Sequence, residues 1–220
     1  MAKFSIVESL EVGWDVAKSN FVLLLGGVVV TLLASAAPPV IMGLLANITE
    51  AGSFTAQMFM SVGSLAHFII YSGLLMGLLK ISLALVDKKT IEFGELFNHF
   101  SLVFSFAVAQ LIAGIAVVIG LFLLIVPGII IAIKLQFFPY FIAEEGCGPI
   151  EALQKSWDIT KGMKFQLFLF DLVVYMMNLL GIICFGVGLF VTAVISIAAA
   201  AFVFRKLESR QEPIAPAPVE

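Results

Sequence analysis

The sequence predicts an all-α protein: a polytopic transmembrane helical bundle of about six spans in three hairpins, with short amphipathic helices at the interface. Hydrophobic residues make up 61% of the 220 residues and charged residues 12%, and the mean hydropathy is +1.13. A soluble domain is about half apolar and about a quarter charged. The apolar residues also form runs of roughly 20 or more, the length that a helix needs to cross a bilayer.

The composition argues against several classes of function. A formal net charge of −3 and the lack of a polybasic run argue against nucleic-acid binding. Cys147 and Cys184 fall at opposite ends of one predicted span, so we expect no internal disulfide. The sequence has no phosphate-binding glycine loop, no zinc-binding histidine motif and no carboxylate cluster beside a base. We therefore expect no enzyme activity, no cofactor and no metal ion.

The N-terminal segment predicts an interfacial helix followed by a first span. Residues 3–19 carry apolar side chains at helical spacing and charged side chains elsewhere, as an amphipathic helix at a membrane surface does. The side chains assigned to the apolar face are Val7, Leu10, Trp14 and Ala17. The first span covers 21–47, and we expect Pro38-Pro39 to end or kink it.

The second span covers 58–86 and contains the small-residue pair Gly73-x-x-x-Gly77. Such a pair allows close helix approach, and we favour packing within the chain over dimerisation. His67 lies in the same span, where we expect a hydrogen-bonded interior residue rather than a proton relay. Another short amphipathic helix follows this span, with its apolar face formed by Phe93, Leu96, Phe97 and Phe100.

The second half of the chain predicts two more hairpins. One consists of spans over 101–126 and 128–143, separated at Pro127-Gly128. A third amphipathic helix covers 149–162, and about 40 largely apolar residues over 164–204 supply two further spans.

The basic residues give the orientation. Eleven of the 12 lie on one side of this layout, and the turns 48–57, 126–129 and 181–188 contain none. The positive-inside rule makes that side cytoplasmic. We predict a multi-pass protein of a prokaryotic inner membrane with both termini cytoplasmic, a single membrane domain over 1–207 and a disordered polar tail over 208–220. Hairpins that turn within the outer leaflet would give the same charge pattern.

Each hairpin follows an amphipathic segment, which suggests three repeats of a surface helix plus a membrane hairpin. The best match pairs SLEVGWDVAKS (9–19) with ALQKSWDITKG (152–162), which share Leu, Trp, Asp and Lys at equal offsets. The alternative is that any interfacial helix favours Trp and Lys.

Several segments together resemble an uncharacterised group of prokaryotic integral membrane proteins. The pattern combines an apolar run ending in Pro-Gly, a basic residue in the next span and an Ala-Leu-x-x-Ser-Trp-x-x-Thr-x-Gly helix; the segments are 77–97, 123–146, 148–162 and 186–207. This group is related to the membrane domain attached to some glycerophosphoryl diester phosphodiesterases. The resemblance implies a fold more than an activity. The chain departs from the pattern where Lys88 replaces a loop glycine and Ala193 a proline.

Polar side chains within the spans are the candidate site. Lys134 and Asp171 lie at roughly 10–14 Å from the predicted cytoplasmic interface, so they could meet between antiparallel helices. Such a pair would line a pathway or headgroup pocket, or it would fix helix register; Lys134 could instead snorkel to the interface. Three further side chains would extend a polar seam through the bundle: Gln110, Gln136 and Asn178.

The function that these features favour is a non-enzymatic scaffold or accessory protein. Its expected partners are membrane lipids, with a membrane protein or a second copy of the chain as further candidates. The alternative is a small transporter or channel for a solute or lipid. A transporter should contain broken helices at mid-membrane, whereas the break expected here, Pro127-Gly128, lies at a hairpin turn.

Overall fold

A computed structural model describes residues 4–50, 52–183 and 187–210, and within these ranges the chain is helical and contains no strand. This confirms the all-α class. Six helical segments are long and apolar enough to cross a membrane, as expected for a multi-pass membrane protein: Phe21–Ala46, Phe54–Val86, Phe93–Leu123, Ile125–Glu145, Lys164–Ile183 and Gly188–Glu208. Cys184 and residues 211–220, on which the disulfide and tail predictions depend, lie outside the described residues.

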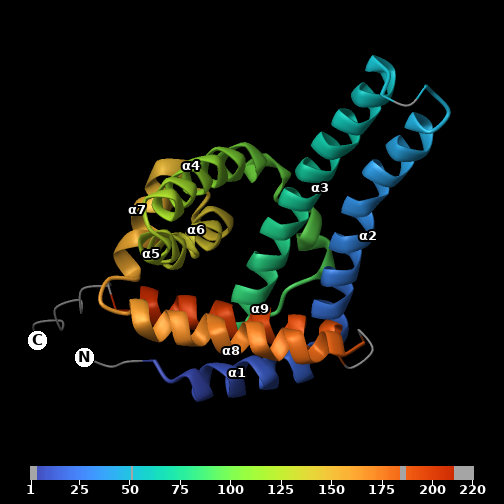
Figure 1. Cartoon of the computed structure of the whole chain (residues 1–220). Helices are drawn as coiled ribbons and strands as arrows, with labels where there is room; N and C mark the ends of the chain where they lie inside the picture. The colour runs from blue at the N-terminus through green and yellow to red at the C-terminus, as the bar shows by residue number, and fades with distance from the viewer. Residues whose placement is uncertain (1–3, 51, 184–186, 211–220) are drawn as a thin grey trace, which may run out of the picture.

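Three helical hairpins account for most of the chain, and Figure 1 shows the tip of the first projecting away from the others. The third hairpin runs crosswise to the first (Figure 1). The arms of the three hairpins are, in order, α2 (Phe21–Ala46) and α3 (Phe54–Val86); α4 (Val103–Leu123) with α5 (Ile125–Leu135) and α6 (Phe138–Glu145); and α8 (Lys164–Ile183) and α9 (Val187–Glu208). The amphipathic segments are α1 (Ile6–Ser19), the 3-10 helices η1 (Phe93–Phe97) and η2 (Phe100–Leu102), and α7 (Pro149–Ile159).

Of the predicted apolar face of α1, Ala17 is buried and Leu10 is partly buried, but Val7 and Trp14 are not covered. The Ser5 hydroxyl caps its start by accepting from the Glu8 N–H. Val7 and Trp14 are 63% and 50% exposed, and the residues that α1 buries are Ser9, Gly13 and Ala17. These small residues let α1 pack closely on α9. Close van der Waals contact, rather than the burial of large apolar side chains, therefore determines which side of α1 is buried.

The two prolines of the first hairpin do not end its helix, because α2 continues through Pro38 and Pro39 to Ala46. Pro39 has no N–H to donate to the carbonyl of Ser35, one turn earlier. His67 of α3 takes this place, with its Nδ1 2.7 Å from the Ser35 oxygen. Since a carbonyl only accepts, Nδ1 carries the proton. His67 is hydrogen-bonded as expected, but it is exposed rather than interior, because no third element covers this part of the hairpin.

The second hairpin turns and breaks at other residues than predicted. Its turn is the extended residue Leu124, and Pro127-Gly128 lies in the first turn of α5, where a missing N–H costs little. The returning arm is interrupted at Gln136-Phe137, between α5 and α6. Pro139 explains this break, because it cannot donate to the carbonyl of Leu135.

The hairpins are buried at one end and exposed at the other. In α3, the residues from Ser72 to Leu85 are buried except for Leu75, Lys80 and Ala84. Earlier in this helix, the buried residues are Ala56 and Gly63. The buried residues of α2 end at Ser35. The three hairpins therefore share a core at the end where α3, α6 and α9 finish, which we call the inner end.

Each amphipathic segment packs on the returning arm of a different hairpin. Gly13 of α1 lies against Ala199 of α9, nine residues before Glu208. Leu96 of η1 lies against Gly77 of α3, nine residues before Val86, so the glycine pair packs within the chain as expected. Ser156 of α7 contacts the break between α5 and α6. Thus α1 packs on the third hairpin, η1 packs on the first hairpin and α7 packs on the second hairpin.

The two matched segments, 9–19 and 152–162, occupy equivalent places in this arrangement. Trp14 and Trp157 both lie on the outward side of their helices. When the two sequences are aligned, the buried Ser9, Gly13 and Ala17 correspond to the buried Ala152, Ser156 and Thr160, while the second segment also buries Leu153 and Ile159. A preference for Trp and Lys at an interface does not by itself place three small residues on the same face, so the packing supports a repeat.

Candidate functional site

The inner ends of the three hairpins meet at one arginine. Arg205 of α9 donates from Nε and Nη2 to both Asp87 oxygens, at 3.0 and 2.7 Å. Its Nη1 donates to Glu144 at 2.7 Å and to Glu208 at 2.8 Å, and its Nη2 also bonds Glu144. Asp87 follows α3, Glu144 ends α6 and Glu208 ends α9, so this Arg205 cluster joins all three hairpins. A planar guanidinium with five donors suits such a position.

A second cation balances part of the negative charge of the Arg205 cluster. Lys80 donates to the backbone carbonyl of Glu144 at 3.1 Å. Local spacing in the sequence does not reveal this cluster, because its members are 57 or more positions apart except for the pair Arg205 and Glu208. A signal was present, since Asp87, Glu144 and Arg205 each stand at the inner end of a returning arm.

Lys134 does not pair with Asp171, and that prediction was wrong. The Lys134 ammonium lies 3.4 Å from the centre of the Trp157 ring, with the residue only 7% exposed. Within the described ranges no carboxylate lies within 4 Å of it. A cation over an indole face is attracted by the ring quadrupole, by about 2 kcal/mol or more when water is excluded.

Asp171 faces Gln136 instead. With the Gln136 amide turned so that its nitrogen faces the carboxylate, it donates to the two Asp171 oxygens at 3.0 and 3.2 Å. Gln136 follows Lys134 by two residues, which puts their side chains on opposite sides of a helix. The expected antiparallel contact is also absent from the described residues: α5 and α8 line a shared groove with residue numbers rising in the same direction.

The break between α5 and α6 is closed by α7. The Ser156 hydroxyl donates to the Lys134 carbonyl at 2.8 Å and accepts from the Phe137 N–H at 3.1 Å. Without it the Phe137 N–H would be unpaired in the buried core, and the Lys134 carbonyl would keep only the 3.4 Å hydrogen bond from the Thr160 hydroxyl; an unpaired group of this kind costs about 1–3 kcal/mol. The mid-span break therefore exists, contrary to the sequence prediction, but one side chain fills it.

The predicted polar seam separates into three places. Gln136 adjoins Asp171, as described above. Asn178 joins the arms of the third hairpin by donating to the Ser196 hydroxyl at 2.9 Å. Gln110 is exposed on an apolar groove between α3 and α4, on a different face of the molecule.

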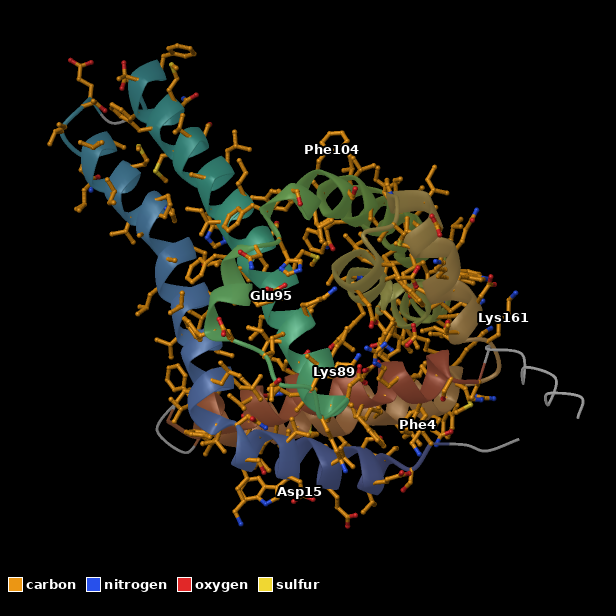
Figure 2. All side chains as sticks on the ribbon, turned by 180° about the vertical axis from the view of Figure 1, so that it is seen from behind. Phe4, Asp15, Lys89, Glu95, Phe104 and Lys161 are labelled. Carbon is orange, nitrogen blue, oxygen red and sulfur yellow. The ribbon has the colours of Figure 1, made fainter. Side chains whose placement is uncertain are left out.

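Three lysines gather where α5, α7 and α8 meet. Lys134 lies over Trp157, one helical turn before Lys161, and Lys164 lines a groove together with Ile133, the neighbour of Lys134. Lys161 is paired with Asp158 at 2.7 Å, and Figure 2 shows it at the end of α7, on the outside of the molecule. For Lys164, as for Lys134, no carboxylate lies within 4 Å in the part of the chain that the structure describes. This lysine cluster (Lys134, Lys161 and Lys164) therefore has an excess of positive charge.

An apolar groove begins at Lys164 of the lysine cluster and runs between α5 and α8. Its first part holds about 320 Å³ and is lined by Lys164 and by Val126, Ile129, Ile130, Ile133, Phe165 and Phe168. A second part of about 770 Å³ shares Ile129, Ile133 and Phe168 with it and continues to Gln136, Asp171 and Tyr175. The groove is therefore apolar along its length, with cations at one end and a polar pair at the other.

The end of α6, the loop after it and helix α7 carry further ionisable groups near the site. Lys155 pairs with Glu145 and with Glu151, and these hydrogen bonds raise the pKa of the Lys155 ammonium above its usual value. Burial, and then the negative charge of Glu145, raises the pKa of the Cys147 thiol. Both groups therefore keep their protons at neutral pH.

The comparisons with known proteins identify one family. A family model described as a domain of unknown function, DUF7847, matches residues 91–211, which covers more than half of the chain. No curated protein and no solved structure matches the chain. No match links it to the membrane domain of glycerophosphoryl diester phosphodiesterases. The matched region contains η1 to α9, and so the lysine cluster, the α5–α8 groove and all of the Arg205 cluster except Asp87. The chain therefore belongs to the DUF7847 family.

Proposed function

We propose that this protein is a non-enzymatic scaffold or accessory protein of a prokaryotic inner membrane that binds an anionic phospholipid. One acyl chain lies in the α5–α8 groove, and the headgroup phosphate is held by the lysine cluster. The observation that carries the proposal is the position of Lys164, which has no acid partner within the described residues and lines the apolar groove beside two further lysines.

The chemistry of the groove fits a lipid better than a soluble ligand. Its walls are aliphatic and phenylalanine side chains, which offer an acyl chain nothing that the bilayer does not. Selectivity must therefore come from the charged end. Each basic side chain near an anionic membrane surface contributes about 1 kcal/mol to the electrostatic attraction between protein and lipid. Lys134 and Lys164 come from different elements, so the headgroup would also tie α5 to α8.

A transporter is the second candidate, because the returning arm of the second hairpin is broken near Lys134. Discontinuous helices at mid-membrane are typical of substrate sites in transporters. Against this, Ser156 occupies the break and satisfies the backbone groups on both sides of it. The break therefore offers no free dipole to a substrate, and we favour binding over transport.

The proposal is tested by lipid binding to the purified full chain. After delipidation, native mass spectrometry measures the binding of phosphatidylglycerol and of phosphatidylcholine with the same acyl chains. We expect tighter binding of phosphatidylglycerol, and we expect Lys164→Ala to weaken it about fivefold, the equivalent of about 1 kcal/mol.

Lys18→Ala is the matched control. It removes one positive charge from α1, in which Lys18 corresponds to Lys161 when residues 9–19 and 152–162 are aligned. Its phosphatidylglycerol binding should stay close to that of the unaltered chain. Equal binding of the two lipids, or equal losses in the two variants, would contradict the proposal. Solute or lipid flux in liposomes that disappears in Lys134→Ala would favour the transporter.

A further inference from the structure

Helix α1 shows where the membrane surface lies. Its outward side carries Glu11, Asp15 and Lys18, which are all exposed. Figure 2 shows Asp15 pointing away from the rest of the molecule. Charged side chains of this kind are expelled from the hydrocarbon core, so the outward side of α1 faces the cytoplasm or the headgroups along its whole length.

Helix α9 runs beside α1 and in the opposite direction. Lys206 pairs with Glu8 at 3.0 Å near one end, and Gly13 lies against Ala199 and Ile195 towards the other. A Cβ placed on Gly13 would be only 2.8 Å from that of Ala199. Two helices that stay in contact over this length have nearly parallel axes, so α9 has the same orientation to the membrane surface as α1. Much of α9 therefore lies along the membrane surface, beneath α1, rather than passing straight through the bilayer.

The second hairpin shows the same relation to α7. Ser156 reaches the middle of the returning arm, while Asp158, two residues later, is 47% exposed. Lys164 then lines one groove together with Val126, which lies two residues from the turn at Leu124. If this hairpin crossed the bilayer, its turn would be at the outer surface and Lys164 would have to lie near it, but residues 158–164 are too few to cross the hydrocarbon core from the exposed Asp158.

The tips of the hairpins differ in the same sense. The α2–α3 connection contains Asn47, Thr49 and Glu50, which are suited to water. The α4–α5 turn consists of Leu124 and its apolar neighbours, which are exposed in the structure. The last described residues of α8, Ile182 and Ile183, are likewise apolar and exposed.

We propose that the α4–α6 and α8–α9 hairpins turn back within the membrane on its cytoplasmic side, whereas α2–α3 crosses it. Figure 1 supports this, because a membrane normal that runs along α2 and α3 does not run along α8 and α9. The surface that these two hairpins present is then an apolar one fitted to the acyl chains of the inner leaflet. A chain inserted in this way adds area to one leaflet, and the inference does not depend on the lipid site proposed above.

Spin-label depth measurements on the full chain in liposomes test the inference. Single cysteines are introduced in a background with Cys147→Ala and Cys184→Ala, and each label reports its relative accessibility to oxygen and to a water-soluble nickel complex. The α8 positions are Phe165, Leu172 and Leu180, all exposed. We expect the ratio of oxygen to nickel accessibility to stay level or rise along α8, without falling towards Leu180.

Helix α2 supplies the control, with exposed positions Val22, Leu33 and Leu44. These span about 33 Å, the thickness of a hydrocarbon core. Their ratio should be highest at Leu33 and low at both ends. A further label, at Leu124 in the turn of the second hairpin, should show a high ratio of oxygen to nickel accessibility. The proposal is overturned for the third hairpin if Leu180 is as open to nickel as Phe165 while Leu172 is not, and for the second if Leu124 is open to nickel.

Discussion

The Arg205 cluster and the lysine cluster each place one cation in the packed part of the molecule, Arg205 and Lys134, and the surroundings of these two cations differ. Arg205 faces three carboxylates from the inner ends of three hairpins. Lys134 faces an indole ring and is influenced by two other lysines. The first cation is satisfied by the fold itself. The second has no carboxylate within 4 Å in the described residues, and this excess of positive charge is what supports the lipid-binding proposal.

Arg205→Ala should have the largest effect of the changes considered. It leaves Asp87, Glu144 and Glu208 without their shared partner in a setting where all three are mostly covered. Removing one partner of a largely buried ion network costs about 3 kcal/mol. Unfolding in mixed micelles measures the loss. Arg210→Ala, at an exposed arginine beyond α9, is the control and should change stability little. Similar losses in the two variants would show that the cluster does not join the hairpins.

Ser156→Ala should have the next largest effect. It leaves the Phe137 N–H unpaired within the core and the Lys134 carbonyl with only the 3.4 Å hydrogen bond from Thr160, which together cost about 2 kcal/mol. Ser209→Ala, at an exposed serine, controls for the loss of a hydroxyl. Hydrogen exchange at the Phe137 amide should also quicken. An unchanged exchange rate would mean that the break is held by packing rather than by this hydroxyl.

Lys134→Met separates binding from stability. Met keeps the length of the side chain and its contact with the Trp157 ring but removes a charge that has no acid partner in the described chain. The lost cation–π attraction and the relieved desolvation oppose each other, so the unfolding free energy should change by less than about 1 kcal/mol. Phosphatidylglycerol binding should still fall. A loss of stability as large as that of Arg205→Ala would make Lys134 structural.

The parts predicted well from the sequence are those that depend on one segment at a time. Apolar runs gave the number of long helices, and the spacing of Gly73 and Gly77 gave close packing within the chain. The Lys134–Asp171 pair failed because it required knowing how two hairpins lie relative to each other. The depth argument assumed helices parallel to one membrane normal, whereas α5 and α8 line their groove in the same direction. Pro139 by itself predicts the break at Gln136, because a proline cannot donate to the carbonyl four residues earlier.

Lys88 offers the smallest and most local test, beside the Arg205 cluster. It follows Asp87 and has φ +57°, a left-handed conformation that glycine adopts without strain. The strain of about 1–2 kcal/mol for a side chain at such a position exceeds the extra entropy that a glycine loses on folding. Lys88→Gly should therefore raise the unfolding free energy by about 0.5 kcal/mol. Lys89→Gly, at a neighbour without positive φ, should lower it instead. Destabilisation by both changes would show that the Lys88 side chain contributes more than its backbone strain costs.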